Sequence, residues 1–204
     1  MCNGKEIKKQ KILEAAYLLF SEKGYKMTKI ADIAAKAGIG KGTVYEYFES
    51  KESLLLSIVS SGIEAYLAKC KSVVESNATQ TGKLLELIKI EDEQYEENGP
   101  RIVKMSQMIL DANDGMPANF IKKMHSLWNQ KYVFINQILV NGIENGEFTK
   151  INTDMATVAI MGATEMYLNV KYGMCAISEV LLPFDTECFK RQELIEFILK
   201  GMQA

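Results

Sequence analysis

The sequence predicts an all-α protein of about nine helices. The chain of 204 residues contains only three prolines. Over long stretches its apolar residues recur at the three- and four-residue spacing of an α-helix, and no stretch gives a strong strand signal. Apolar residues make up 48% of the chain, which is enough for a packed core and argues against disorder.

Three short helices are expected at the start of the chain. Residues 6–23 carry one apolar stripe at helical spacing, and Gly24 follows as a stop signal. Thr28 is expected to be the N-cap of a second helix, which Gly38 closes. Residues 41–47 form the third.

Six further helices are expected after these three. Turn-forming segments separate them, namely SNATQTG, NGP, DANDGMPAN, NGEF and LLPFD. The expected helical ranges are 51–75 with Ser50 as its cap, 82–97, 101–111, 118–144, 153–172 and 186–202.

Several classes of protein and site are disfavoured by composition. The four cysteines form no CxxC pair and there is one histidine, so a Cys/His metal site is not expected. Free thiols in a reducing cytoplasm are the expectation, with a redox-sensing pair as the alternative. No signal peptide and no membrane-spanning run is recognised, so a cytoplasmic location is expected. No GxSxG, P-loop or HExxH motif occurs, and we expect neither an enzyme nor a cofactor.

The charge is distributed unevenly. Residues 1–51 hold ten lysines and six acidic residues, a net charge of +4, whereas residues 52–204 hold 14 basic and 20 acidic residues, a net charge of −6. This asymmetry fits a small segment that meets a polyanion and is attached to a larger body that does not.

The second and third predicted helices have the pattern of a helix-turn-helix unit. The turn between them is only Gly38-Ile39-Gly40, and glycine can adopt the positive φ that a sharp reversal needs. Val44 and Phe48 lie four residues apart and share the face that packs inward. Such a unit places its second helix in the major groove of DNA. A helical hairpin with half-exposed tyrosines is the alternative.

The residues around this unit suit contacts to DNA. Lysines can neutralise phosphates or donate to guanine, hydroxyl groups can bond phosphate oxygens, and glycine allows a close approach. The start of the fourth helix, with its lysine, is a natural phosphate site, and the start of the second helix is another. The expected DNA-binding residues are Thr28, Lys29, Gly38, Lys41, Gly42, Thr43, Tyr45, Tyr47 and Lys51.

Residues 27–55, MTKIADIAAKAGIGKGTVYEYFESKESLL, closely resemble the DNA-binding segment of the TetR family of bacterial transcriptional regulators. The shared positions are Thr28, Asp32-Ile33-Ala34, Ala37-Gly38, Gly42-Thr43, Tyr45, Tyr47-Phe48 and Ser50-Lys51-Glu52. Two positions depart from the pattern. Gly40 replaces a frequent serine, and Ser53 replaces a frequent acid, which is expected to weaken the capping box at Ser50.

The resemblance implies two domains and a two-fold dimer. Residues 1–50 would form the helix-turn-helix DNA-binding domain and residues 51–204 a helical domain for effector binding and dimerisation. The last two helices, 153–172 and 186–202, would pair across the dimer, with Gly162 allowing close approach. The alternative is that their apolar stripes belong to the internal core.

A Met- and aromatic-rich region suggests where a small-molecule effector would bind. The chain contains eleven methionines, whose shapes adapt to a greasy or flat ligand, although plain core packing is the alternative for each. Glu165 would select a cationic or hydrogen-bonding ligand if it faces a cavity, and has no such role if it faces solvent. The acidic run at 91–98 is expected to be a solvated helix face, with contact to a cationic ligand as the alternative. The candidate ligand-binding residues are Met105, Met108, Trp128, Tyr132, Glu165 and Tyr167.

These observations together predict a sequence-specific DNA-binding transcriptional regulator. We expect a ligand-responsive repressor that acts as a homodimer on a palindromic operator. The alternative is a protein of the same fold that acts as a DNA-bound partner or coactivator without a small-molecule effector, in which case the cavity should be absent or filled.

Overall fold

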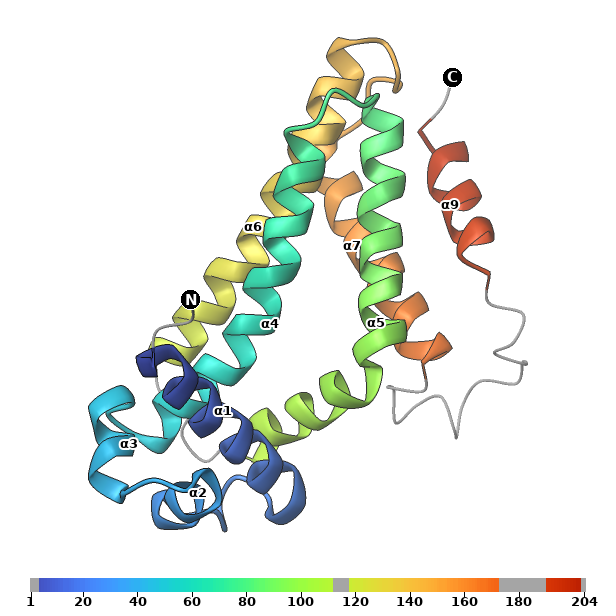
Figure 1. The fold of residues 1–204 in the computed structure, drawn as a ribbon. Helices are drawn as coiled ribbons and strands as arrows, with labels where there is room; N and C mark the ends of the chain where they lie inside the picture. Colours follow the sequence, from blue (N-terminus) through green and yellow to red (C-terminus); the bar gives the residue numbers. More distant parts are fainter. Residues whose placement is uncertain (1–3, 112–117, 173–189, 203–204) are drawn as a thin grey trace. The chain divides into compact units, whose positions relative to one another are not determined.

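All regular elements are α-helices in the computed structural model, which describes residues 4–111, 118–172 and 190–202 (Figure 1). These residues contain eight helices, against the nine expected. Their bounds are α1 Gly4–Lys23, α2 Ile30–Ala37, α3 Lys41–Tyr47, α4 Lys51–Val74, α5 Gln80–Asp111, α6 Ala118–Glu144, α7 Thr153–Lys171 and α9 Arg191–Lys200. The DANDGMPAN and LLPFD segments lie wholly or mostly outside the described residues.

Two of the expected helices are one continuous helix, α5, and Pro100, where a break was expected, lies inside it. The prediction of two helices, 82–97 and 101–111, was therefore wrong. Proline has the φ of a helix but lacks one backbone donor, and it costs about 3 kcal/mol in a helix interior. Here the helical backbone continues through it, so neighbouring packing must offset that cost.

The second correction concerns the start of α2. The N-cap residue is Lys29 and not Thr28, and the backbone N–H of Lys29 donates to the Asp32 carboxylate at 3.3 Å. At the other end of α2, Gly38 has φ 69°, which confirms that this glycine closes the helix.

The chain forms two compact units. The first unit consists of Met1–Glu64 and Arg101–His125, and the second of Ala65–Pro100 and Ser126–Ala204. Helices α4, α5 and α6 each contribute residues to both, and Pro100 is the last residue of the second unit's first segment. The functional division expected after residue 50 stays a prediction.

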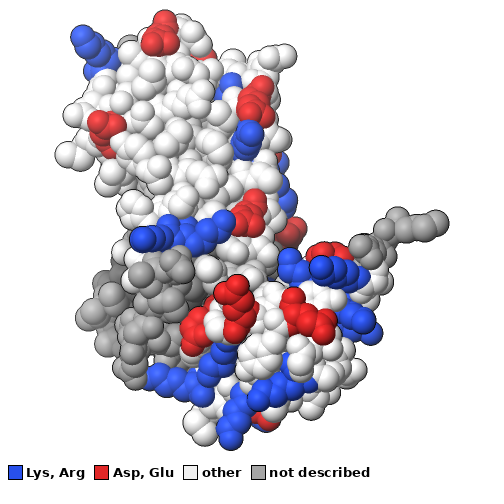
Figure 2. Space-filling view, turned by 90° about the vertical axis from the view of Figure 1, so that its left-hand side faces the viewer, with Lys and Arg blue, Asp and Glu red and all other residues white. Residues whose placement is uncertain are grey.

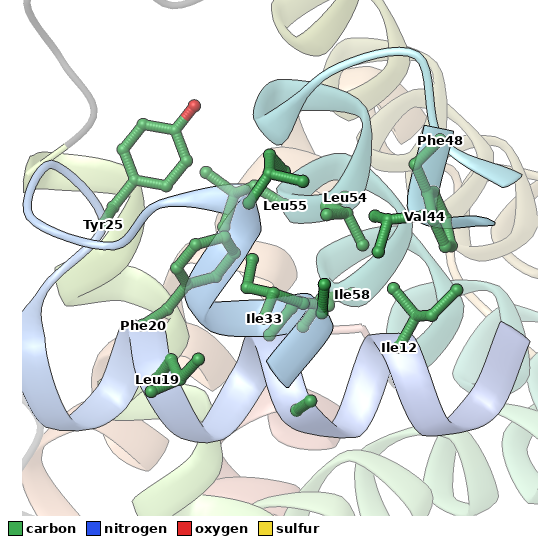
Figure 3. Packing of buried hydrophobic residues seen from close by; sticks show 14 of the residues in the cluster. Ile12, Leu19, Phe20, Tyr25, Ile33, Val44, Phe48, Leu54, Leu55 and Ile58 are labelled. Atoms are coloured by element: carbon green, nitrogen blue, oxygen red, sulfur yellow. The ribbon is translucent and has the colours of Figure 1, made fainter. Parts of the chain in front are cut away.

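The first unit is organised around one apolar core. The stripe expected on α1 is buried, and Phe20 packs its ring 5.2 Å from that of Tyr25. Ile12 of α1 lies beside Val44 of α3 and Phe48, with their side chains pointing toward one another (Figure 3). This core therefore fixes which side of α3 faces inward.

The second unit has its own core, built from α4, α5, α6, α7 and α9. The start of α5 is held from outside the helix, because the Glu147 carboxylate accepts the backbone N–H groups of Gln80 and Thr81, both at 3.0 Å. These bonds favour the charged carboxylate and lower the pKa of Glu147.

Helix α4 is long and apolar enough to pass for a membrane-spanning segment by length and composition, which the sequence analysis did not expect. Its apolar side chains are nevertheless used in packing. Leu54, Leu55 and Ile58 are buried in the core of the first unit, and Cys70 is buried in the core of the second.

We predict that Gly142→Ala destabilises the protein. A Cβ at Gly142 would lie 2.1 Å from Cδ2 of Phe148, whose ring is buried beneath the turn that ends α6. Overpacking of this kind costs about 1–3 kcal/mol. The matched control is Gly62→Ala in α4, where a Cβ meets open space and helix propensity gains up to about 1 kcal/mol. In urea unfolding, the midpoint concentration should be lower than that of the wild type for Gly142→Ala only. Equal midpoints for the two variants would contradict this packing.

Candidate functional site: nucleic-acid interface and buried cavity

The turn between α2 and α3 is fixed by backbone hydrogen bonds. The N–H of Ile39 donates to the carbonyl of Ala34 at 3.0 Å, and that of Gly38 donates to the carbonyl of Ala35 at 3.2 Å. With Gly38 at φ 69°, these bonds form the left-handed helix end that favours glycine. The side chain of Ile39 packs against the first unit's core. The entry angle of α3 is therefore determined by local geometry.

Helix α3 has a buried side and an exposed side. Val44 is fully buried, whereas Lys41, Gly42 and Tyr45 are exposed. The Lys41 Nζ lies 5.9 Å from the centre of the Tyr45 ring, within the range of a cation–π contact. The two remaining predicted contact residues of this helix, Thr43 and Tyr47, are half-buried.

Thr28 lies in a different environment from the one expected. Its side chain is 1% exposed, and its hydroxyl is within hydrogen-bond distance of the carbonyls of Leu19 (3.2 Å) and Gly24 (2.9 Å). The hydroxyl therefore joins the end of α1 to the start of α2 from inside the unit. Its neighbour Lys29 is exposed.

Lys51 uses its ammonium group inside the protein. Its Nζ donates to the carbonyls of Tyr25 (2.8 Å), Lys26 (3.3 Å) and Thr28 (3.1 Å), which accounts for all three N–H donors. The same Nζ lies 4.3 Å from the centre of the Tyr25 ring. Partial burial lowers the pKa of Lys51. The structure thus shows Lys51 holding the loop between α1 and α2.

The start of α4 keeps its capping box despite the serine at position 53. The Ser53 N–H donates to the Ser50 hydroxyl at 3.1 Å, and the Ser53 hydroxyl accepts the Ser50 N–H at 3.2 Å. The Ser53 hydroxyl also donates to the Ser50 carbonyl at 2.8 Å, and this additional hydrogen bond offsets the expected weakening of the cap.

The basic surplus of the first 51 residues is spread over the surface. Figure 2 shows lysine and arginine side chains next to acidic ones over the lower part of the view, where α1 to α3 lie. One such pair joins Lys36 of α2 to Glu22 of α1 at 3.4 Å. Because no field of a single sign covers the visible face, attraction of DNA would depend on individual lysine side chains and not on a broad positive surface.

The second unit encloses a small cavity with one apolar and one polar wall. The enclosed space is about 10 Å³, room for about one water molecule. The apolar wall comes mainly from α5, α6 and α7. The polar lining residues are Tyr66, Cys70, Glu91, Lys131 and Thr164.

Two of these polar residues form a buried ion pair. The Lys131 ammonium donates to the Glu91 carboxylate, and the two side chains are each only 10% exposed. Burial raises the pKa of Glu91, while the positive charge of Lys131 acts in the opposite direction. The expectation of a solvated face for residues 91–98 was therefore wrong for Glu91.

The next residue, Asp92, is also buried and joins three helices. Its carboxylate, 5% exposed, accepts the ammonium of Lys171 at 2.8 Å and the guanidinium of Arg191 at 3.2 Å. The hydroxyl of Tyr172 donates to the same carboxylate at 3.0 Å. The ends of α7 and α9 are thus tied to α5 by one acid.

The six residues proposed from sequence for a ligand site lie in different places. Trp128 is 48% exposed and Tyr132 bonds the Asp154 carboxylate, and neither lines the cavity. Tyr167 is buried with its ring 5.5 Å from the Lys171 ammonium. Glu165 accepts the Tyr95 hydroxyl at 3.1 Å. The side chains of Met105 and Met108 are outside the described residues.

The sequence contained a signal for the buried ion pair that the first interpretation missed. Glu91 continues the apolar stripe of Leu84, Leu87 and Ile88 at helical spacing. Lys131 likewise occupies a position of the apolar stripe of α6, one turn before Ile135. A charged residue on an apolar stripe must be paired or partly solvated.

Comparison with known proteins identifies the N-terminal segment of the chain. Residues 12–58 match the family model described as bacterial regulatory proteins, tetR family. This segment, which includes α2 and α3, is a DNA-binding region of the TetR type. The protein is a DNA-binding transcriptional regulator of helix-turn-helix type.

Three similar proteins match most of the length of the chain. An uncharacterised HTH-type transcriptional regulator YfiR from Bacillus subtilis is 26% identical over 90% of this chain and 84% of its own length. The HTH-type transcriptional repressor KstR2 of Rhodococcus jostii is 24% identical over 76% of this chain and 74% of its own. The crystal structure of FadR from Bacillus subtilis in complex with stearoyl-CoA has a TM-score of 0.71 at 20% identity, covering 95% of this chain and 98% of that one.

We predict that Lys51 and Lys41 have separable roles. Lys51→Met should lower the free energy of unfolding by about 1–3 kcal/mol, because three carbonyl groups lose their donor. Lys41→Met, at an exposed site of α3, should leave stability unchanged and weaken binding to DNA. Urea unfolding and fluorescence anisotropy with labelled DNA measure the two effects. A Lys51 variant with full stability and weaker binding to every DNA sequence would show that Lys51 contacts phosphate instead.

Proposed function

We propose that this regulator is a ligand-responsive repressor that binds a palindromic operator as a homodimer. The observation that carries the proposal is the two-sided helix α3. Its inner side is held by Val44, and its outer side presents Lys41, Gly42 and Tyr45 on a turn of fixed geometry. A helix mounted in this way can enter the major groove without rearrangement of the unit.

The proposed DNA contacts follow from exposure. Lys41 and Tyr45 are the residues of α3 best placed to reach base edges, and the absent side chain of Gly42 leaves room for the DNA backbone. Lys29, at the exposed start of α2, is proposed to contact phosphate. Thr28 and Lys51 are proposed to position these residues, and Thr43 and Tyr47 to reach the DNA from half-buried positions.

Helix α7 supports the proposed dimer. Met155, Val158 and Met166 are 70%, 60% and 56% exposed, and the exposed Ala159 and Gly162 continue the same helical face. An apolar stripe of this kind is typical of an interface. A second copy on a two-fold axis would cover it and set the two α3 helices about 34 Å apart, one turn of DNA.

The last helix contributes less to this interface than the sequence suggested. Ile195 and Ile198 are buried in the core of the second unit, so they are internal. Phe197, which the sequence analysis did not single out, is 74% exposed on α9 and is the residue of this helix that we propose for the interface. Residues 186–189 of the expected interface lie outside the described residues.

The effector is proposed to bind within the second unit. A small cavity in this unit combines polar groups with apolar lining residues. Binding would then favour one separation of the two α3 helices over another, and affinity for the operator would change by the difference in effector affinity between the two states. The proposal is supported by the solved FadR of similar fold, which is in complex with stearoyl-CoA.

A regulator without a small-molecule effector is the second candidate. The observation that favours it is the volume of the cavity, which is far below that of a drug-sized site of about 300–1,000 Å³. An effector would therefore have to displace side chains as it enters.

Operator binding is tested with DNA from the region upstream of the gene. The protein should bind one segment of it far more tightly than unrelated DNA, and the affinity should fall steeply with salt. Tyr45→Ala should weaken this binding by about 1–3 kcal/mol with unchanged stability. Val133→Ala, an equally exposed side chain of α6, is the control. Equal affinity for all DNA sequences would contradict the proposal.

The dimer is tested by charge on the apolar stripe. Val158→Glu should convert the dimer to monomer in sedimentation velocity and reduce operator binding, because two linked α3 helices gain affinity that one lacks. The matched control is Val133→Glu at a similarly exposed apolar position of α6. A Val158→Glu protein that remains dimeric would place the interface elsewhere.

A further inference from the structure

The small cavity of the second unit is lined by two buried charged side chains, Glu91 and Lys131. Glu91 and Lys131 are 7% and 8% exposed, and removing two charges from water costs several kcal/mol per ion, which their mutual attraction offsets only in part. An apolar pair of the same volume would pack this position at least as well. Retention of the charges is therefore better explained by a role in binding than by stability.

A second, independent observation points to a ligand. Thr164 of α7 is 2% exposed and lines the same cavity, yet its Oγ1 has no hydrogen-bond partner. A buried hydroxyl without a partner costs about 1–3 kcal/mol. A polar group of about the size of one water molecule, placed in the cavity, would supply that partner.

The charges around the cavity favour a cation. Glu165 directly follows Thr164 on α7, and its partner Tyr95 lies one helical turn beyond Glu91 on α5, so the two carboxylates are neighbours. The donors that Glu165 accepts from, the hydroxyl of Tyr95 and the amide of Asn169, are uncharged. Two carboxylates therefore lie near a single ammonium, that of Lys131: Glu91 lines the cavity and is paired with it, and Glu165 lies behind the lining, close enough to act on Glu91.

The remaining titratable groups near the cavity do not change its net charge. From α4, Tyr66 and Cys70 line the cavity, and burial raises the pKa of Tyr66 well above its ordinary value and that of Cys70 to about 11. Both are uncharged at neutral pH. On the neighbouring helices, Lys171 and Arg191 are bonded to Asp92.

We propose that this cavity binds the protonated amino group of an apolar amine. The ammonium would donate one hydrogen bond to the Thr164 Oγ1 and one to the Glu91 carboxylate, and its charge would balance the second carboxylate, Glu165. The alkyl body would lie against the apolar wall, where the flexible side chain of Met161 can move aside. The inference rests on the proposed role of the second unit as the effector-binding part.

An anionic ligand fits the same cavity less well. Its carboxylate would compete with Glu91 for Lys131, and two carboxylates already stand nearby. Neighbouring carboxylates in a buried site repel each other by several kcal/mol, unless one of them takes up a proton. Anionic and neutral ligands of equal length are therefore the informative comparison.

The test uses three ligands that differ only in the head group: octylamine, octan-1-ol and octanoate. Isothermal titration calorimetry at pH 7 should show that the full-length protein binds octylamine at least about tenfold more tightly than either of the others, a difference of about 1.4 kcal/mol. Thr164→Val and Glu165→Gln should each reduce the affinity for octylamine by about fivefold or more, with little effect on octan-1-ol. Thr153→Val, in the first turn of the same helix, is the control and should bind like the wild type.

These two variants keep the inference falsifiable even if Glu91→Gln fails to fold because it leaves Lys131 unpaired. Equal affinity for the three ligands, tighter binding of octanoate, no binding of octylamine, or unchanged octylamine affinity in both variants would each overturn it. Release of operator DNA is measured separately by anisotropy. Octylamine that binds as expected without releasing DNA would support this site and contradict the proposed effector response, whereas DNA release by other compounds without amine binding would do the reverse.

Discussion

Burial of one face of a seven-residue helix is the constraint on which the DNA-binding unit depends. A helix as short as α3 is not stable alone in water, so its position is set by what its apolar side chains contact. Val44 and Phe48 enter the core beside Ile12, and Lys41 and Tyr45 of α3 are thereby turned outward. Stability and the exposed surface of α3 are coupled here, because the same packing that forms the helix also determines which of its side chains face outward.

The second unit is governed by a different constraint, the pairing of charges inside an apolar core. Asp92 joins α5 to the ends of α7 and α9, so the helix that carries the exposed apolar stripe is tied to the helix that lines the cavity. Changes at the cavity and at the stripe therefore act on the same helices. The proposed coupling between effector and dimer geometry would act through such shared elements.

Much of the fold could be predicted from sequence because it follows local rules. Residues 41–47, the glycine that ends α2, and the bounds of α6 follow from apolar spacing and backbone chemistry. The errors have tertiary causes. Pro100 lies inside a helix that packing stabilises, Thr28 is buried so that Lys29 is the N-cap of α2, and Glu91 is buried although its neighbours are acidic. The apolar stripe of α5 indicated that Glu91 is buried, but its partner Lys131 lies 40 residues away, and two of the carbonyls that Lys51 bonds lie 26 and 23 residues away. No local pattern could have identified these partners.

The central claim, that the exposed side of α3 is the surface that meets DNA, is tested most directly by lysine footprinting. The protein is acetylated with and without operator DNA, and the reactivity of each lysine is read by mass spectrometry. The account predicts that DNA protects Lys41 and Lys29, that Lys51 reacts slowly in both conditions, and that Lys71, exposed in the second unit, is unaffected. Protection of Lys71 with unchanged reactivity of Lys41 would contradict it.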